Sequence, residues 1–317
     1  MQKLLFSTLI AGLLASVAVA MPDPPGPAVV QIVRAPSILT AQKISAPKVL
    51  YPEGRVDFDI VEAMVDRMIT SVTGKEGWMA WQAIFAANDR VGIMVDAGTY
   101  PTQMATVETL INRLVGAGLS PNNILVFSGS ENDLFATGYR VRHEGQGVRV
   151  YGADSEGYRG GISRIPSDYC DAMINLASLQ VDPDTGFAGC VANALNCVPF
   201  AKRVEARRNL ALLPQAAALP VVRQKTRLCL LEAYVPLLDI QGSNKVTYQY
   251  KGLIAGTDPV AVDLVGRRVL EECRKAQKGS DWPLPQTTDY LQLAQQKYRL
   301  GQAEPDKIQV NELDINR

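Results

Sequence analysis

The sequence predicts an α/β protein with a mostly parallel, doubly wound sheet, helices on both faces, and a helical inserted segment at about residues 179–220. Three observations predict this class. Short apolar runs of strand length recur along the chain, apolar stripes at helical spacing separate them, and the segment Gly252–Cys273 joins the two patterns in one unit. Alternating strands and helices are typical of parallel pairing in which both faces of the sheet are covered.

The expected elements follow one another through residues 29–317, which we interpret as a single α/β domain. Apolar runs predict strands at Ala28–Val33, Val91–Val95, Asn123–Phe127, Val148–Tyr151, Asp171–Leu176, Arg227–Leu231, Leu253–Ala255 and Lys307–Val310. Apolar stripes at helical spacing predict helices at Val56–Val72, Thr102–Val115, Cys190–Leu213, from Pro259 to about Cys273, and Thr287–Tyr298.

Gly252–Cys273 is the most informative of these segments. The apolar run Leu253–Ala255 reads as a buried strand, Thr257 and Asp258 offer helix-capping oxygens, and Pro259 suits a first helical turn. In open α/β sheets, ligands bind beyond the carboxyl ends of the strands. We therefore expect Asp258 to lie near a ligand crevice.

The N-terminus is typical of a secretory signal peptide over residues 1–20. Lys3 precedes the apolar run Leu4–Leu14, and Ala18–Ala20 forms a small-residue cleavage site. The cleavage site favours a signal peptide over a membrane anchor, because an anchor is not cleaved. A proline-rich spacer follows at residues 21–28. We expect an exported protein, periplasmic or extracellular, with no membrane span after cleavage.

The charges of the chain balance, with 32 basic and 32 acidic side chains. This balance argues against nucleic-acid binding, which needs a basic surface. A basic patch at Lys202, Arg203, Arg207 and Arg208 is best interpreted as a solvated helix face. The oligomeric state stays open.

Cysteine and histidine usage limits the chemistry. No CxxC pair is present, so an iron–sulfur cluster or a zinc ribbon is not expected. The only histidine, His143, lies in a Gly-rich segment and is better explained as a solvated loop residue than as a general base. The cysteines favour buried thiols or at most two disulfides, whose pairing stays open: Cys170, Cys190, Cys197, Cys229 and Cys273.

Acidic residues stand at or after the ends of predicted strands. They are Asp96, Asp133, Glu232 and Asp258. If these strand ends share one edge, the carboxylates converge, and converging carboxylates need a cation, a proton or a basic partner. A divalent cation such as calcium or magnesium is a possible cofactor, with Asp96, Asp133 and Asp258 as the candidate metal ligands.

Four segments together resemble the bacterial family catalogued as domain of unknown function 362. They are NDRVGIMVD at 88–96, DAMINLASLQ with TGFAGCVANAL at 171–195, AGTDPVAVD at 255–263, and RLGQAEPDKIQV at 299–310. The resemblance implies a site that includes Asp182 and Asn193. The chain also departs from the family at five positions. Met94, Gln180 and Ala192 stand where the family usually has lysine. Asp96 stands where it usually has asparagine, and Asp182 where it usually has histidine.

The sequence therefore predicts an exported binder of a small ligand or cation, in a crevice lined by Asp96, Asp133, Asp182, Asn193, Glu232 and Asp258. Two alternatives remain open. The same crevice could belong to a metal- or cofactor-dependent enzyme of redox or isomerase type, or it could be vestigial in an envelope interaction module.

Overall fold

The structure, a computed structural model, describes residues 25–40 and 55–315. The expected signal peptide at residues 1–20 and most of the expected spacer lie outside these residues. Within them, no helix is long and apolar enough to cross a membrane.

The strands form one sheet of ten strands and two small two-stranded sheets. Their bounds are β1 Ala28–Arg34, β2 Leu39–Thr40, β3 Arg55–Val56, β4 Val91–Val95, β5 Ile124–Ser128, β6 Arg149–Gly152, β7 Tyr158–Arg159, β8 Ile162–Ser163, β9 Ala172–Asp182, β10 Gly186–Ala188, β11 Thr226–Gln241, β12 Asn244–Thr247, β13 Gly252–Gly256 and β14 Ile308–Asp314.

The α-helices are α1 Phe58–Thr73, α2 Trp78–Gln82, α3 Met104–Gly116, α4 Glu131–Ala136, α5 Ala153–Glu156, α6 Cys190–Asn193, α7 Phe200–Arg208, α8 Leu212–Ala217, α9 Pro220–Lys225, α10 Pro259–Lys278 and α11 Tyr290–Gln296. Short 3-10 turns and one π turn connect some of them.

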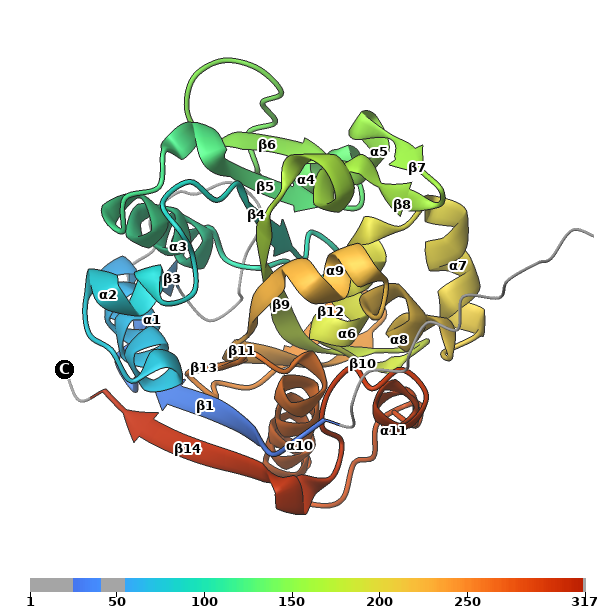
Figure 1. Ribbon diagram of the computed structural model, residues 1–317. Coiled ribbons are helices and arrows are strands. Elements are labelled where there is room, and N and C mark those ends of the chain that lie inside the picture. The colour runs from blue at the N-terminus through green and yellow to red at the C-terminus, as the bar shows by residue number, and fades with distance from the viewer. Residues whose placement is uncertain (1–24, 41–54, 316–317) are drawn as a thin grey trace, which may run out of the picture.

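The large sheet has the order β14-β1-β13-β11-β9-β4-β5-β6 (Figure 1), and β10 and β12 pair outside this path with β9 and β11. The central strands β11, β9, β4, β5 and β6 run parallel. Only β13 interrupts the path, because it runs antiparallel to both β1 and β11. The mostly parallel α/β class expected from the sequence is confirmed.

Helices cover both faces of the sheet, as neighbouring residues of β1 show. Gln31 points toward α1, where its Oε1 accepts a hydrogen bond from the Ser71 hydroxyl at 2.7 Å. Val30 points the other way, and a Cβ atom on its partner Gly256 would meet both Val30 and Val262 of α10. Thus α1 and α10 lie on opposite faces of the sheet (Figure 1). Buried apolar residues of both helices belong to the core.

The helical inserted segment starts later than expected. Residues 179–188 complete β9 and form β10, so helices begin only at Cys190 and continue through α9. The difference arises because β9 is buried along nearly its whole length and pairs with strands on both sides, which lets it continue well past the predicted end at Leu176.

Candidate functional site

The strand order of the sheet reverses between β4 and β9. From β4 the chain moves outward to β5 and β6, and it later returns to β9 and β11 on the other side of β4. Such a reversal opens a crevice at the carboxyl ends of the two strands, because their connections leave in opposite directions. A crevice of about 190 Å³ lies at this point. Asp96 follows β4 there, and Asp182 ends β9.

Polar side chains from four parts of the chain line the crevice. They include Asp96, Ser128, Asp133, Gln180, Asp182, Asn193, Asn196 and Arg203. Four of the six site residues predicted from the sequence are therefore brought together: Asp96, Asp133, Asp182 and Asn193.

Two hydrogen bonds hold the Asp96 carboxylate. Its Oδ1 accepts from the Gly98 backbone N–H at 2.8 Å, and its Oδ2 accepts from Gln180 Nε2 at 2.6 Å. Burial raises the pKa of the Asp96 carboxyl to about 6; the two hydrogen bonds oppose the rise, and the charges of Asp182 and Asp133 add to it. The charges of Asp182 and Asp133 therefore act on Asp96, which exchanges its proton near pH 6.

Asp182 is partly buried, as Asp96 is, whereas Asp133 is exposed. Asp182 Oδ1 accepts from the backbone N–H groups of Asp184 at 2.9 Å and Thr185 at 2.8 Å, so it also shapes the turn between β9 and β10. Asp133 is exposed in the first turn of α4, where its own N–H donates to the Ser130 hydroxyl at 3.2 Å. Both acids face the crevice from its margins, and each retains oxygen atoms for a ligand.

Asn193 belongs to a network of side-chain amides. Its Nδ2 donates to Asn175 Oδ1 at 2.8 Å, and its Oδ1 accepts from Asn196 Nδ2 at 2.7 Å. Asn196 in turn accepts from the Gly129 N–H at 3.0 Å and donates to the Val95 carbonyl at 3.2 Å. The hydrogen bonds of the Asn193 side chain are thus made within the protein. They position Asn196 between the ends of β4 and β5.

Glu232 does not line the crevice. Its side chain is 3% exposed, and its Oε2 accepts from the Gln103 N–H at 2.8 Å. Burial raises the pKa of the Glu232 carboxyl to about 8; the Thr106 and Gln103 hydrogen bonds oppose this rise, and the charge of Asp96 adds to it. The acid lies in the middle of β11, which extends nine residues beyond it to Gln241.

Asp258 does not line the crevice either, because it caps α10 as its sequence context predicts. Its Oδ1 accepts from the N–H groups of Val260 and Ala261, each at 2.9 Å, and its Oδ2 accepts from the Gln302 N–H at 2.8 Å. The expected metal ligands Asp96, Asp133 and Asp258 are therefore not gathered. Residues 25–40 and 55–315 contain no group of three or more His, Cys, Asp or Glu side chains arranged to hold a metal ion.

His143 lies outside the crevice between two acids. Its Nε2 is 2.8 Å from Glu131 Oε2, its Nδ1 is 3.2 Å from Glu156 Oε1, and its ring stacks on Tyr151 at a centroid distance of 5.1 Å. The five cysteines are all buried and free. Neither residue type contributes to the crevice.

Several lining residues were not expected from the sequence, among them Asn196, Arg203 and Arg207. Asn196 stands three residues after Asn193, a spacing that places both on one side of a helical turn, so this pair could have been found. Arg203 was assigned to a solvated face of its helix, and nothing in its neighbourhood distinguishes it from Arg207 and Arg208.

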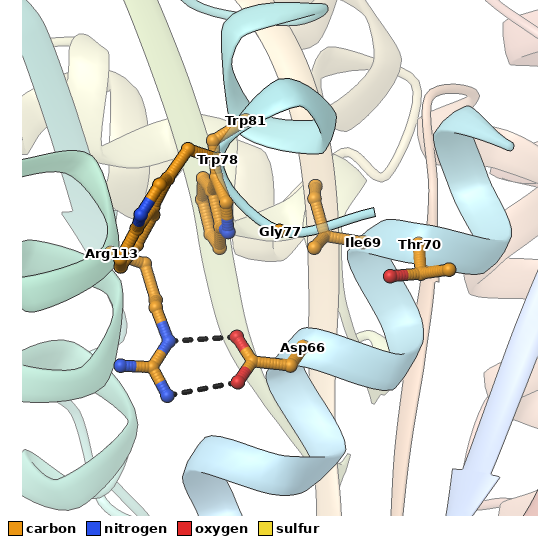
Figure 2. Close-up of a pocket in the computed structure, with 7 residues that line it drawn as sticks. All are labelled: Asp66, Ile69, Thr70, Gly77, Trp78, Trp81 and Arg113. Atoms are coloured by element: carbon orange, nitrogen blue, oxygen red, sulfur yellow. Dashed lines mark hydrogen bonds and ion pairs between the residues drawn. The ribbon is translucent and has the colours of Figure 1, made fainter. Parts of the chain in front are cut away.

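A second cavity, of about 370 Å³, lies between α1, α2 and α3. Figure 2 shows Trp78 and Trp81 in its wall and the two hydrogen bonds that join Arg113 to Asp66, at 2.7 and 2.9 Å. The charged groups in this wall thus neutralise each other, and the remaining surface is largely aromatic. The crevice between β4 and β9 is the stronger candidate because its acids are not paired in this way.

Comparison with protein families identifies a match. The family described as Domain of unknown function (DUF362) matches residues 96–268. The chain belongs to the DUF362 family. No curated protein matches it. A crystal structure of a Thermotoga maritima protein aligns with 71% of this chain and 60% of its own length, at 11% identity and a TM-score of 0.38.

Four of the five positions at which the sequence resemblance implies a departure from the DUF362 pattern line the crevice. Asp96, Gln180, Asp182 and Ala192 all line it. The fifth, Met94, is buried beside Cys197, with its sulfur 3.5 Å from the cysteine sulfur. Where the resemblance implies asparagine, lysine, histidine and lysine, the crevice has Asp96, Gln180, Asp182 and Ala192, so it is more acidic than the resemblance implies.

Proposed function

We propose that this DUF362 protein binds a small polar ligand in the crevice between the ends of β4 and β9. The observation that carries the proposal is the meeting of Asp96, Asp133 and Asp182 where the strand order reverses. Like charges gathered in a partly buried site repel unless a proton, a cation or a ligand donor group offsets them. A ligand with N–H or O–H groups, best a cationic one, would supply that compensation.

The size of the crevice limits the ligand. Its volume of about 190 Å³ is below the range of about 300–1,000 Å³ typical of pockets for drug-sized molecules. A molecule of a few non-hydrogen atoms fits this space. Asp96 is the principal contact in this proposal, because its carboxylate is oriented by Gly98 and Gln180 and therefore needs little reorganisation on binding.

The test is a thermal-melt screen with small amines, polyols, calcium and magnesium, followed by calorimetric titration of the compounds that stabilise the protein. We expect Asp96→Asn to weaken binding at least tenfold. Asp306→Asn, which changes an exposed acid far along the chain, should bind like the wild type. The proposal is wrong if no compound stabilises the protein, or if Asp96→Asn binds as tightly as the wild type.

We also propose that binding takes place outside the cytoplasm, on the strength of the signal-peptide pattern at residues 1–20. Fractionation of cells that express the full chain, with mass analysis of the exported form, tests this. Cleavage after Ala20 is the expected result, and an uncleaved cytoplasmic chain would contradict it.

A further inference from the structure

Two arginines of α7, Arg203 and Arg207, line a crevice whose other charged side chains are acids. Arg207 lies 3.3 Å from Asp184, whereas Arg203 has no such ion pair among the described residues. The Arg203 guanidinium lies directly against the backbone at the end of β5. A Cβ atom on Gly129 would overlap Arg203 Nη1 and would lie 2.9 Å from its Cζ. Glycine at this position therefore makes room for the arginine beside Asn196 and Ser128.

Arg203 also differs from its neighbours on α7 in lacking an acidic partner. Lys202 pairs with Glu205 at 2.7 Å, and Arg207 pairs with Asp184 at 3.3 Å. In the part of the chain that the structure describes, no ion pair involves Arg203, and its Nε is buried without a hydrogen-bond acceptor. Its guanidinium carbon lies 5.5 Å from the Phe200 ring, and its charge also acts on the Tyr158 hydroxyl. A buried donor without a partner is unfavourable, which an anionic ligand group would relieve.

The positive charge of Arg203 and the negative charges of the acids together restrict the chemical class of the ligand. A purely cationic molecule would meet Arg203 unfavourably, and a purely anionic one would meet the three carboxylates. A molecule with both charges can place its anion on Arg203 and its cation toward Asp96. Arginine suits this role, because its planar guanidinium can donate two parallel hydrogen bonds to a carboxylate.

We propose that the crevice takes a small zwitterion of the amino acid class, with the ligand carboxylate on Arg203 and the ligand ammonium facing Asp96. This inference rests on the proposed function, because it assumes that the crevice is the ligand site. It adds the substrate class and a specificity-determining residue.

The experiment uses the mature chain and the standard amino acids as probes. Thermal melts with each amino acid identify the strongest binder, and calorimetry then compares it with the amine that lacks its carboxylate and the acid that lacks its amino group. We expect the amino acid to bind at least tenfold more tightly than either analogue. A single lost charge–charge hydrogen bond accounts for an effect of this size.

Two matched variants of α7 test whether Arg203 is the residue that binds the ligand carboxylate. Arg203→Gln should weaken binding of the amino acid at least tenfold. It should raise the affinity for the amine, because the amine no longer meets the arginine charge. Arg208→Gln, an exposed arginine of the same helix, should bind all probes as the wild type does. Matching melting temperatures of the two variants without ligand would exclude a folding defect.

The outcomes separate the inference from the proposed function. If the amine binds as tightly as the amino acid, and binding depends on Asp96 but not on Arg203, the zwitterion inference is wrong and the proposed function stands. If the amino acid binds to Asp96→Asn and to Arg203→Gln as tightly as to the wild type, both are wrong. If no amino acid raises the melting temperature, the inference is wrong, and the wider screen decides the proposed function.

Discussion

Asp96 makes ligand binding depend on pH. Burial raises the pKa of its carboxyl to about 6, so the carboxylate is mostly ionised at neutral pH and mostly protonated one or two pH units below 6. A cationic ligand group prefers the ionised form. We therefore expect affinity to be highest above this pKa and to fall as the pH drops through about 6, in calorimetric titrations across that range.

Asp96→Asn supplies the control for this pH dependence. Its amide does not titrate, so the weakened affinity that remains should be flat over the same pH range. An unchanged pH profile in Asp96→Asn would mean that another group controls binding.

The five cysteines give a second prediction for single residues. Burial raises the pKa of Cys170 and of Cys273 to about 12 each, and it also raises the pKa values of Cys190 and Cys197. Because the thiolate is the reactive form, none of the buried thiols should react with a thiol reagent at neutral pH. Unfolding in guanidinium should expose all five. Rapid reaction of any thiol in the native protein would contradict this.

At the scale of elements, Asp258 fastens the start of α10 to the C-terminal segment. Asp258→Ala removes the acceptor for three backbone N–H groups. We expect a loss of roughly 1–2 kcal/mol in the free energy of unfolding, the upper range for a lost helix cap. Asp258→Asn should keep the helix cap but lose the acceptor for the Gln302 N–H, so we expect it to be less destabilised than Asp258→Ala and less stable than the wild type. Ligand affinity should be unchanged in both, because Asp258 does not line the crevice.

The position of Asp258 shows where the sequence argument fails. The strand and the capped helix at 252–278 are both confirmed, but β13 runs antiparallel to its neighbours β1 and β11. Its carboxyl end therefore lies at the opposite edge of the sheet from the ends of β4 and β9. Local sequence specifies the cap well, whereas strand direction depends on tertiary pairing.

Glu232 shows that the sequence did not predict the length of a strand correctly. The predicted strand ended at Leu231, which would put Glu232 at a strand end, but β11 continues to Gln241. The strand continues because it pairs with β9, β12 and β13 along its length. By contrast, the bounds of β4 match the prediction residue for residue, so Asp96 was placed correctly.

Across the whole molecule, the site depends on segments that are distant in sequence. Asp96, Asp182 and Arg203 meet only because the chain moves outward from β4 and later returns on its other side. The alternation of strands and helices was sufficient to predict the class and the presence of a crevice beyond the ends of parallel strands. It could not predict that a helix beyond β10 would supply a cation, because that contact exists only in the folded chain.

The burial of carboxyl groups also makes the stability of the whole protein depend on pH. Asp96, Glu232 and Asp263 are held in the folded chain with pKa values raised by burial to about 6, about 8 and about 7, from ordinary values of 3.8, 4.5 and 3.8. Asp263 caps α6 from within the core, where its oxygens accept from the N–H groups of Cys190 and Val191 at 2.6 and 2.8 Å. Each folded carboxyl therefore retains its proton to a higher pH than the unfolded one does.

From this we predict that the free energy of unfolding falls as the pH rises from about 5 to about 8, since the unfolded chain releases these protons first. Acids with lowered pKa values, such as Asp171 at about 2, are already ionised in both states across this range and do not oppose the trend. Urea unfolding measured at several pH values tests it. Glu232→Gln should flatten the upper part of the curve, because Glu232 has the highest of the three pKa values, and Asp306→Asn should leave the curve unchanged. Stability that rises toward pH 8 would show that these acids are not buried as the structure describes.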